Sequence, residues 1–548
     1  MTPGDVDANV LLDIRGLQIA LPPGSDRALA VDTVNLQLHH DEILCLVGES
    51  GSGKSLTARA VLGLLPGPRV HVRAGEIRFL GEDLLQVPAA RLREVRGRDI
   101  SMIFQEPMTA LNPLMTIGDQ IDELIAAHTS LKPVDRRARI VELLGSVHLP
   151  EPERLAQSYP HEISGGQRQR AMIAMALILE PRIIIADEPT TALDVTTQAQ
   201  ILKLLKELQA VHRTGVLYIT HDFGVVAEIA DRVAVMQQGR LVEIGPASQV
   251  LQQPNHPYTR TLIAAVPKLA PAPARGDAQA PCVLRVVDLN KTYAGRRSLF
   301  GGGGRQVHAV NGVNLELRRG DTLGIVGESG SGKSTVARLI TRIIEADSGE
   351  IWLGDIDLLS LSRRQLRPHR KRVQMVFQDP FGSLNPRYKV GRLIAEGAIV
   401  HGASRSDAYR RARELLQLVG LDERAIDRYP HEFSGGQRQR IGIARALALE
   451  PDVLVADEPV SALDVSVQAQ VLKLLTDIRD RLSLSMVFIT HDLRVAAQLC
   501  DTVAVMSQGR IVECGPAEQI FGQPRHDYTR ALLESVPGRD WTPPVIGA

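Results

Sequence analysis

The octapeptide GESGSGKS occurs twice, at residues 48–55 and 327–334. Each copy follows an apolar run typical of a buried strand and precedes a helical pattern, which is the context of a phosphate-binding loop. The glycines let backbone N–H groups converge on phosphate oxygens, and the N-terminus of the following helix adds its dipole. The lysine of each loop would contact the β- and γ-phosphates, and the final serine would bind Mg²⁺. The expected nucleotide-binding residues of the loops are Gly48, Glu49, Ser50, Gly51, Ser52, Gly53, Lys54, Ser55 and Leu56, and Gly327, Glu328, Ser329, Gly330, Ser331, Gly332, Lys333, Ser334 and Thr335.

Two acidic residues end each of the buried-strand patterns IIIADE and VLVADE. Asp187 and Asp457 fit ligands of Mg²⁺, directly or through water. Glu188 and Glu458 fit bases that polarise an attacking water, because successive side chains of a strand point to opposite faces. A lone Asp-Glu pair at a strand end is more often a solvated turn. The phosphate loop upstream of each pair favours the catalytic interpretation.

The loops belong to a long internal repeat. They are offset by 279 residues, whereas the two SGGQ segments, the two ADEP segments and the two ITHD segments are offset by 270. From SGGQ onward the spacing is rigid: 24 residues separate Ser164 from Glu188, and 33 more lead to His221, with the same intervals in the second copy. Rigid spacing indicates that this block holds the chemistry, and the variable block before it is expected at the periphery.

Short β-branched runs alternate with helical patterns in each half. EILCLVG, RIIIAD and VLYIT are bounded by turn residues, which predicts βαβ units and a mainly parallel sheet. Stretches 117–128 and 407–420 have helical periodicity and indicate a helical region between phosphate loop and SGGQ. Residues 267–281, rich in Pro and Ala, are typical of a semi-extended linker, and residues 295–306 are typical of an inserted surface loop.

The composition disfavours several classes of protein. Lys plus Arg and Asp plus Glu both total 63, so no overall positive charge favours nucleic acid as a partner. Four scattered cysteines without CxxC spacing disfavour a disulfide framework, a zinc site and an iron–sulfur cluster. The N-terminus lacks the pattern of a secretory signal, and the longest apolar run, 171–179, is shorter than the ~20 residues of a membrane span. Work at a membrane would require other chains to supply the spans.

SGGQ, at 164–167 and 434–437, is the signature of the ATP-binding cassette family, which this chain resembles over nearly its whole length. The resemblance implies an α/β fold with two tandem P-loop NTPase cassettes. Each cassette would have a RecA-like parallel-sheet core, an antiparallel β subdomain and a helical subdomain. The expected domains are a first cassette with its C-terminal tail at 1–266, a linker at 267–281, and a second cassette with its tail at 282–548.

The resemblance also implies residue roles. The glutamines in MIFQEP and MVFQDP would sense Mg²⁺ and a membrane partner, the ITHD histidines would contact the γ-phosphate, and Asp194 and Asp464 would connect the two halves. Cassettes of the family meet head to tail, so each ATP would lie between the phosphate loop of one and the SGGQ of the other. The implied sets are Ser164, Gly165, Gly166, Gln167, Ser434, Gly435, Gly436 and Gln437 for nucleotide; Ser55, Gln105, Asp187, Ser334, Gln378 and Asp457 for metal; and Glu188, Glu458, His221 and His491 for catalysis.

The two halves differ at positions beside this machinery. Tyr293 stands where the family places an aromatic ring against adenine, whereas the first half has Leu21 at the nearest matching position. Since stacking of a base on an aromatic ring contributes ~1–3 kcal/mol, we expect weaker nucleotide binding in the first site. Met175 replaces the arginine that the family favours and that the second half has as Arg445. Both sites keep their reactive residues and should hydrolyse ATP.

The tails NHPYTRTLIAAVP and RHDYTRALLESVP, with LNP after each MIFQEP-like segment, resemble the dipeptide, oligopeptide and nickel importer branch. Packing of an amphipathic helix would also explain the tails. The branch implies two multispanning permease subunits as partners, an extracytoplasmic substrate-binding protein acting through them, a peripheral location on the cytoplasmic face of the inner membrane, and no direct contact with the cargo. Only Cys282 lies near the first tail, so we expect no iron–sulfur cluster.

Di- or oligopeptides are the first choice of cargo, with a nickel chelate or haem as alternatives. Two soluble classes of cassette protein compete with the importer interpretation. Translation factors of the family have a long charged helical linker, whereas this linker is short and Pro-rich. Cassette proteins of DNA repair carry zinc-binding Cys clusters, which this sequence lacks. Association with membrane permeases, ribosomes or DNA would separate the three classes.

Overall fold

The computed structural model describes residues 9–106, 110–190, 193–271, 279–293, 306–461 and 463–544. The chain forms two compact units, Met1–Val266 with Pro537–Ala548, and Pro267–Val536. Much of the expected linker and nearly all of the expected loop at 295–306 lie outside the described residues. The last residues group with the first unit, where the Gly538 N–H donates to Glu228 at 3.2 Å.

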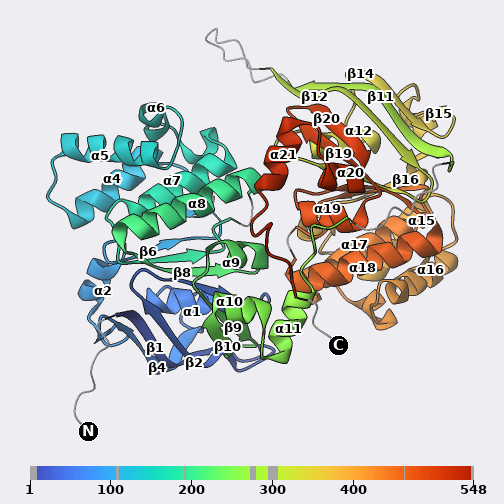
Figure 1. Ribbon diagram of the computed structural model, residues 1–548. Helices are drawn as coiled ribbons and strands as arrows, with labels where there is room; N and C mark the ends of the chain where they lie inside the picture. Colours follow the sequence, from blue (N-terminus) through green and yellow to red (C-terminus); the bar gives the residue numbers. More distant parts are fainter. Residues whose placement is uncertain are drawn as a thin grey trace. The chain divides into compact units, whose positions relative to one another are not determined.

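The first unit has two sheets, which occupy the blue to green part of Figure 1. The four-stranded sheet is antiparallel and has the order β2 (Leu29–His39), β1 (Val10–Ala20), β4 (His71–Phe79) and β5 (Glu82–Asp83). The six-stranded sheet has the order β10 (Arg240–Pro246), β9 (Arg232–Gln237), β3 (Ile43–Val47), β8 (Gly215–Thr220), β7 (Ile183–Asp187) and β6 (Ile100–Ile103). Strand β10 runs antiparallel to β9, and the other neighbours in this sheet are parallel.

The helices of the first unit follow the predicted alternation with strands. Helix α4 spans Ile117–His128, as its periodicity predicted, and begins at Thr116, whose side chain accepts the Asp119 N–H. The α-helices are α1 (Lys54–Val61), α2 (Ala89–Val95), α4, α5 (Pro133–Ser146), α6 (Pro152–Ala156), α7 (Gly165–Leu177), α8 (Val195–His212), α9 (Phe223–Ile229), α10 (Ala247–Gln252) and α11 (Pro257–Ala264), with a 3₁₀ turn, η1, at Pro160–Glu162.

The second unit repeats both sheets. Its antiparallel sheet has the order β12 (Val307–Arg318), β11 (Cys282–Tyr293), β14 (Ser348–Leu353) and β15 (Ile356–Asp357). Its larger sheet has the order β16 (Val373–Val376), β17 (Val453–Asp457), β18 (Ser485–Ile489), β13 (Thr322–Val326), β19 (Thr502–Ser507) and β20 (Arg510–Pro516). The architecture of both units confirms the expected α/β class with a parallel core and an antiparallel β subdomain.

Among the described residues, the helices of the second unit follow the same order as those of the first, with η2 and α14 in addition and a 3₁₀ turn, η3, in the place of α6. The predicted helix at 407–420 is α16, which begins two residues earlier and ends two residues earlier than expected. The helical elements are α12 (Lys333–Ile340), α13 (Arg363–Leu366), η2 (Arg370–Arg372), α14 (Pro380–Ser383), α15 (Val390–Val400), α16 (Arg405–Leu418), η3 (Glu423–Asp427), η4 (Pro430–Glu432), α17 (Gly435–Leu447), α18 (Val465–Leu482), α19 (Leu493–Leu499), α20 (Ala517–Gly522) and α21 (Asp527–Glu534).

The hydrophobic core fixes where the reactive loops emerge. In the first unit, buried residues of β1, β2 and β3 pack with Ala58 and Val61 of α1, so α1 is held between the two sheets. Strands β3, β7 and β8 are buried along their whole length, as expected for parallel strands that are covered on both faces. Since β3, β8 and β7 are neighbours and parallel, the loops at their carboxyl ends meet at one edge of the sheet.

Among the described residues, no helix combines the length and the apolar character needed to cross a membrane.

Candidate functional site

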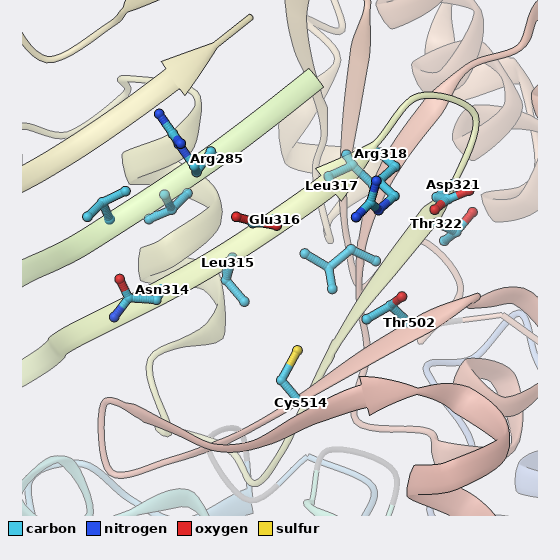
Figure 2. A pocket seen from close by; sticks show the side chains of 13 residues that line it. Arg285, Asn314, Leu315, Glu316, Leu317, Arg318, Asp321, Thr322, Thr502 and Cys514 are labelled. Atoms are coloured by element: carbon cyan, nitrogen blue, oxygen red, sulfur yellow. The ribbon is translucent and has the colours of Figure 1, made fainter. Parts of the chain in front are cut away.

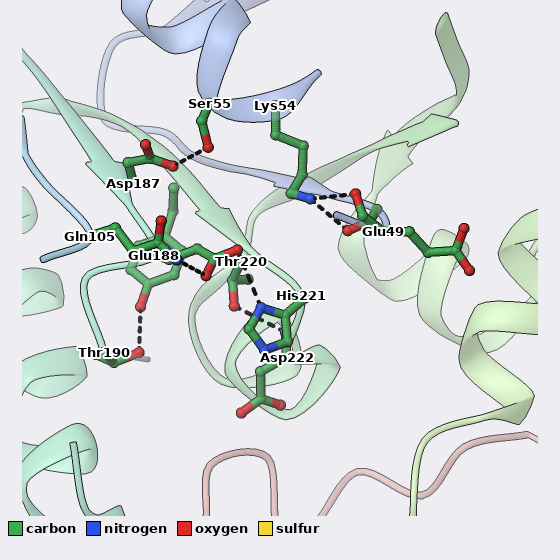
Figure 3. Close-up of polar contacts among 12 residues, drawn as sticks. Glu49, Lys54, Ser55, Gln105, Asp187, Glu188, Thr190, Thr220, His221 and Asp222 are labelled. Carbon is green, nitrogen blue, oxygen red and sulfur yellow. Dashed lines mark hydrogen bonds and ion pairs between the residues drawn. The ribbon is translucent and has the colours of Figure 1, made fainter. Parts of the chain in front are cut away.

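The phosphate loop joins β3 to α1 in the first unit and β13 to α12 in the second. The Lys54 ammonium donates to the carbonyl oxygens of Gly48 and Glu49 at 2.7 and 2.9 Å, and Lys333 makes the same two bonds at 2.8 Å (Figure 3 shows the first unit). Gly48 has a φ of 148°, and a Cβ there would lie 2.2 Å from the carbonyl oxygen of Met236. The first glycine is therefore required by the close approach of β9.

A serine and an aspartate lie together beside each loop. Ser55 Oγ donates to Asp187 Oδ1 at 2.7 Å, and Ser334 Oγ donates to Asp457 Oδ1 at 3.0 Å (Figure 3). Asp187 is fully buried, and its second carboxylate oxygen has no hydrogen-bond partner. Burial raises the pKa of both aspartates above the usual value, because desolvation outweighs the hydrogen bond from the loop serine. A buried carboxylate oxygen without a partner, next to a hydroxyl, provides the hard oxygen donors that fit Mg²⁺.

The glutamate that follows each aspartate is held by two side chains. Gln105 Nε2 donates to Glu188 Oε2 at 2.9 Å, and His221 Nδ1 lies 3.3 Å from Glu188 Oε1 (Figure 3). In the second unit Gln378 donates to Glu458 at 2.8 Å, and His491 Nδ1 lies 3.3 Å from the same carboxylate. Both glutamates have a φ of 46°, in the left-handed region that a non-glycine residue rarely adopts. The structure thus brings together the predicted glutamine, glutamate and histidine in each unit.

Charge couples the histidine and glutamate of the second unit. Burial would raise the pKa of Glu458, but the hydrogen bond and positive charge of His491 outweigh it, so this pKa lies below its usual value. Burial would lower the pKa of His491, but the Glu458 carboxylate outweighs it and raises this pKa. The pair therefore favours a charged carboxylate that a protonated imidazole can stabilise.

A cavity of about 750 Å³ opens beside the second phosphate loop. Its lining includes Lys333, Ser334, Gln378 and Glu458. Residues of β12 form another wall, where Val307 pairs with Tyr293 at the end of β11. The ring of Tyr293 is exposed, whereas Leu21, directly after β1, is partly buried against the core of the first unit. The two positions therefore differ in exposure as well as in the presence of an aromatic ring.

The SGGQ residues lie at the N-terminus of a helix in each unit, as predicted. Ser164 accepts the Gln167 N–H at 3.3 Å and Gln167 accepts the Ser164 N–H at 2.9 Å, which forms a capping box on α7. Ser434 and Gln437 form the same box on α17. A Cβ at Gly436 would lie 2.3 Å from Val467, so close packing of α17 against α18 requires this glycine. In each unit, the SGGQ residues begin one helix and the phosphate loop precedes another.

Asp194 and Arg445 each make a hydrogen bond that supports a local element of the structure. Asp194 caps α8 by accepting the Thr197 N–H at 2.9 Å. Arg445 of α17 is partly buried, and its guanidinium donates to the carbonyl oxygen of Ser383 at 2.6 Å. Ser383 ends the short helix α14, which follows Gln378. Met175 stands at the matching position of α7 and has no charged group for this bond.

Sequence reasoning missed two contacts on the phosphate loops. The Glu49 N–H donates to the Tyr258 hydroxyl, and the Glu328 N–H donates to the Tyr528 hydroxyl, both at 3.2 Å. The only signal in the sequence is that both tails contain the same YTR segment. The Arg27 guanidinium also donates to the Gly51 carbonyl oxygen. The internal repeat could not predict this bond, because the second half has Gln306 at the position that matches Arg27.

A second cavity of about 450 Å³ lies at the other end of the core sheet in the second unit (Figure 2). Thr502, Asp321 and Cys514 line it, with Glu316 and Arg318 of β12. Because Thr322 and Thr502 are at the amino ends of β13 and β19, this cavity is distinct from the one beside the phosphate loop.

Comparison with known proteins gives the family. The profile of the ABC transporter family matches residues 31–191 and 310–461, and the profile of the oligopeptide/dipeptide transporter C-terminal region matches residues 242–298 and 512–542. The peptidoglycan transport ATP-binding protein YejF of Agrobacterium fabrum is 50% identical over 531 residues, which are 96% of this chain and 97% of that protein. The glutathione import ATP-binding protein GsiA of Salmonella paratyphi A is 46% identical over 566 residues, 98% of this chain and 91% of that protein.

The phosphate loop, acidic pair and SGGQ helix of each unit fall within the ABC transporter matches, and both tails fall within the matches of the C-terminal region. The expected resemblance is therefore confirmed over nearly the full length of the chain. The chain belongs to the ABC transporter family, as an ATP-hydrolysing protein with two cassettes, each followed by the C-terminal region of oligopeptide and dipeptide transporters.

Proposed function

We propose that this chain hydrolyses ATP to drive the import of di- or oligopeptides through a partner membrane permease. The observation that carries the proposal is the duplicated arrangement of Lys, Ser, Asp, Gln, Glu and His at the edge of each core sheet, in a chain with two peptide-transporter C-terminal regions. The names of the relatives support a peptide-like cargo, because glutathione is a tripeptide. They do not mention nickel or haem.

Each phosphate loop would bind the triphosphate of ATP. The Lys54 ammonium, which donates to two loop carbonyl oxygens in this structure, would turn to the β- and γ-phosphates. Ser55 and Asp187, with the side-chain oxygen of Gln105, would hold Mg²⁺, whose charge neutralises phosphate oxygens. Ser334, Asp457 and Gln378 would do the same in the second unit. The partnerless, buried oxygen of Asp187 supports this assignment.

The glutamate beside each metal site would polarise the attacking water. Glu458 has a lowered pKa and so is ionised at neutral pH, as a base must be. Gln378 and His491 hold its two carboxylate oxygens and would orient it toward the water. We assign the same roles to Glu188, Gln105 and His221. His221 and His491 would also contact the γ-phosphate through the ring nitrogen that does not face the carboxylate.

We propose further that the two cassettes share their nucleotides. The first site would combine Lys54, Asp187, Glu188 and His221 with the SGGQ of the second cassette, and the second site would combine the matching residues with the SGGQ of the first. Support comes from the helix N-termini at Ser164 and Ser434, whose backbone amides can face an anion. ATP contacts from both cassettes would stabilise a closed state, and loss of the γ-phosphate would let the cassettes separate.

The permease would consist of two multispanning subunits, which receive cargo from an extracytoplasmic binding protein. The helical subdomains next to Gln105 and Gln378 would contact cytoplasmic loops of the permease, and this chain would then lie on the cytoplasmic face of the membrane. Selection of the cargo would then depend on the binding protein and the permease.

Reconstitution tests this proposal. The chain would be co-purified with its two permease subunits, inserted into vesicles with the binding protein, and supplied with ATP and labelled di-, tri- and tetrapeptides, a nickel–histidine chelate or haem. We expect ATP-dependent uptake of peptides and stimulation of ATP hydrolysis by the loaded binding protein. Uptake of the chelate or haem alone would reassign the cargo. Co-purification with ribosomes or DNA instead of permeases would overturn the importer function.

A further inference from the structure

The C-terminal tails contact the phosphate loops directly, although the partners are far apart in the sequence. Tyr258, at the start of α11, accepts the N–H of Glu49, which lies 209 residues earlier. Tyr528, at the start of α21, accepts the N–H of Glu328, which lies 200 residues earlier. The distance is 3.2 Å in both units. Each contact lies within one unit, so the structure repeats the same link twice.

The peptide group that the tyrosine contacts is the one that holds the loop lysine. The peptide between Gly48 and Glu49 offers its carbonyl oxygen to Lys54 at 2.7 Å and its N–H to Tyr258. The peptide between Gly327 and Glu328 does the same for Lys333 and Tyr528. An acceptor on the N–H polarises the carbonyl oxygen of the same peptide and fixes its plane. The tyrosine therefore acts on the lysine through one rigid peptide group.

We propose that Tyr258 and Tyr528 are positioning residues that set the orientation of the phosphate loop and its lysine for nucleotide binding. This role rests on the proposed nucleotide site. The glycine at the start of the loop cannot supply the constraint itself, because a residue without a side chain has wide backbone freedom. The β9 carbonyl that approaches Gly48 limits the loop on one side, and the tail tyrosine fixes the next peptide.

The rest of the tail motif holds the tyrosine in place. The Glu243 carboxylate accepts the N–H groups of Asn255 and His256 at 2.7 and 3.1 Å, and the His256 ring accepts the N–H of Tyr258 at 3.2 Å. Arg260 donates to the carbonyl oxygens of Pro254 and Asn255. The tail turn is thus fixed from both sides of the tyrosine.

The second tail repeats this support. The Glu513 carboxylate accepts the N–H groups of Arg525 and His526 at 2.8 and 3.1 Å, and the His526 ring accepts the N–H of Tyr528 at 3.1 Å. Burial would raise the pKa of Glu513, but the nearby Thr529 hydroxyl and these two N–H groups outweigh burial and lower the pKa. A helix that only packs against the core would need neither the ionised carboxylate nor the hydroxyl, whereas a device that places one hydroxyl against the loop needs both.

The test compares Tyr258→Phe, Tyr528→Phe and the double variant with the unaltered full chain. Phenylalanine keeps the ring and removes only the hydroxyl that accepts the N–H. We expect the Kd for ATP, measured by titration with a non-hydrolysable analogue, to rise about 2- to 10-fold at each altered site, the range for losing one net hydrogen bond. KM should rise similarly, with kcat at saturating ATP changed less than about twofold. Tyr409→Phe serves as the matched control, because the Tyr409 ring on α16 lies against Gly391 of α15.

Thermal unfolding separates positioning from simple stabilisation. If the tyrosines position the loop, the midpoint without nucleotide stays nearly unchanged and the upward shift on adding the analogue shrinks. A lower midpoint without nucleotide, together with an unchanged Kd, would overturn the proposal and leave a packing role. A variant with Lys54→Ala and Lys333→Ala should lose analogue binding. If that variant still binds, the proposed nucleotide site fails, whatever the tyrosines do.

Discussion

The two units of this chain keep the same reactive residues but support them differently. The Ser–Asp, Gln–Glu and Glu–His contacts agree within 0.3 Å between the units, from 2.7 and 3.0 Å for Ser–Asp to 3.3 Å twice for Glu–His. The positions around them differ: Leu21 against Tyr293, and Met175 against Arg445. The two halves therefore keep the side chains proposed to hydrolyse ATP. They differ in a residue proposed to bind the base and in a residue that supports the segment after Gln378. We therefore expect the two sites to differ more in nucleotide affinity and local stability than in the rate of ATP hydrolysis.

Removal of the proposed base is the strongest test of equivalence. We expect the double variant Glu188→Gln and Glu458→Gln to lose ATPase activity about 100-fold or more, because general base catalysis typically contributes 10²–10⁴-fold. Each single variant should retain roughly half of the activity if the sites work independently. The measurement is phosphate release by the chain in complex with its permease. Loss of nearly all activity in Glu458→Gln, with little change in Glu188→Gln, would contradict equivalent chemistry and make the first site mainly structural.

An exchange of the residues at the ends of β1 and β11 tests the expected difference in affinity. Tyr293→Leu should weaken analogue binding at the second site about 5- to 150-fold, which corresponds to the ~1–3 kcal/mol of base–aromatic stacking. Leu21→Tyr should strengthen the first site, by less, because Leu21 is partly buried. Two-site calorimetric titration resolves both changes. Equal affinities in the unaltered chain would show that the exposed ring of Tyr293 does not contact the base.

The partly buried Arg445 should stabilise the segment that follows Gln378. Arg445→Met copies the first unit and removes the bond to the Ser383 carbonyl oxygen, at a cost of about 1–3 kcal/mol. Hydrogen exchange at the amides around residues 379–385 should accelerate about 5- to 100-fold, because local opening becomes easier. Arg445→Lys, which retains a donor but not the shape of the guanidinium, should fall between. Unchanged exchange would mean that packing alone holds α14.

The pair His491 and Glu458 predicts a dependence on pH. The pKa of His491 in the folded chain lies above its unfolded value of 6.5, so its pairing stabilises the fold fully below pH 6.5. This contribution is lost as pH rises through the folded pKa. Glu458→Gln removes the main cause that raises the pKa of His491, and burial should then lower this pKa below its unfolded value. NMR titration of the His491 imidazole, assigned with His491→Gln, measures this change in pKa. An unchanged pKa in Glu458→Gln would refute the effect of Glu458 on His491.

Short motifs predicted where the loops and capped helices lie, because phosphate and metal chemistry fixes residue types over short spacings. The loop, the acidic pair and the capped SGGQ helix fall where the sequence placed them, and helix α4 has its predicted bounds. The contact of Tyr258 with Glu49 could not be predicted, since nothing local to either residue encodes a hydrogen bond across 209 positions. The sequence also could not predict that Pro537 and the residues after it belong to the first unit, because no local pattern in them encodes this association. Pairing of distant segments is decided by packing of the whole unit.

The smallest expected effect concerns the amino end of the core sheet. In the first unit Arg232 begins β9, pairs with Leu44, and donates to Glu42 at 2.8 Å. In the second unit Thr502 occupies this position opposite Leu323 and lines the 450 Å³ cavity with Asp321, the counterpart of Glu42 (Figure 2).

Thr502→Arg should place a guanidinium near Asp321, as Arg232 does near Glu42. The gain should stay below about 1 kcal/mol, because exposed ion pairs contribute little and Arg318, which also lines the cavity, repels a second guanidinium. Thr502→Met, which adds a long apolar side chain without a charge, is the control, and the midpoint of thermal unfolding at low and high salt is the measurement. A gain that salt removes supports an ion pair like that of Arg232. A gain equal in both variants would show that filling the cavity with apolar atoms matters, and the difference between the two units at this edge would then be one of volume rather than charge.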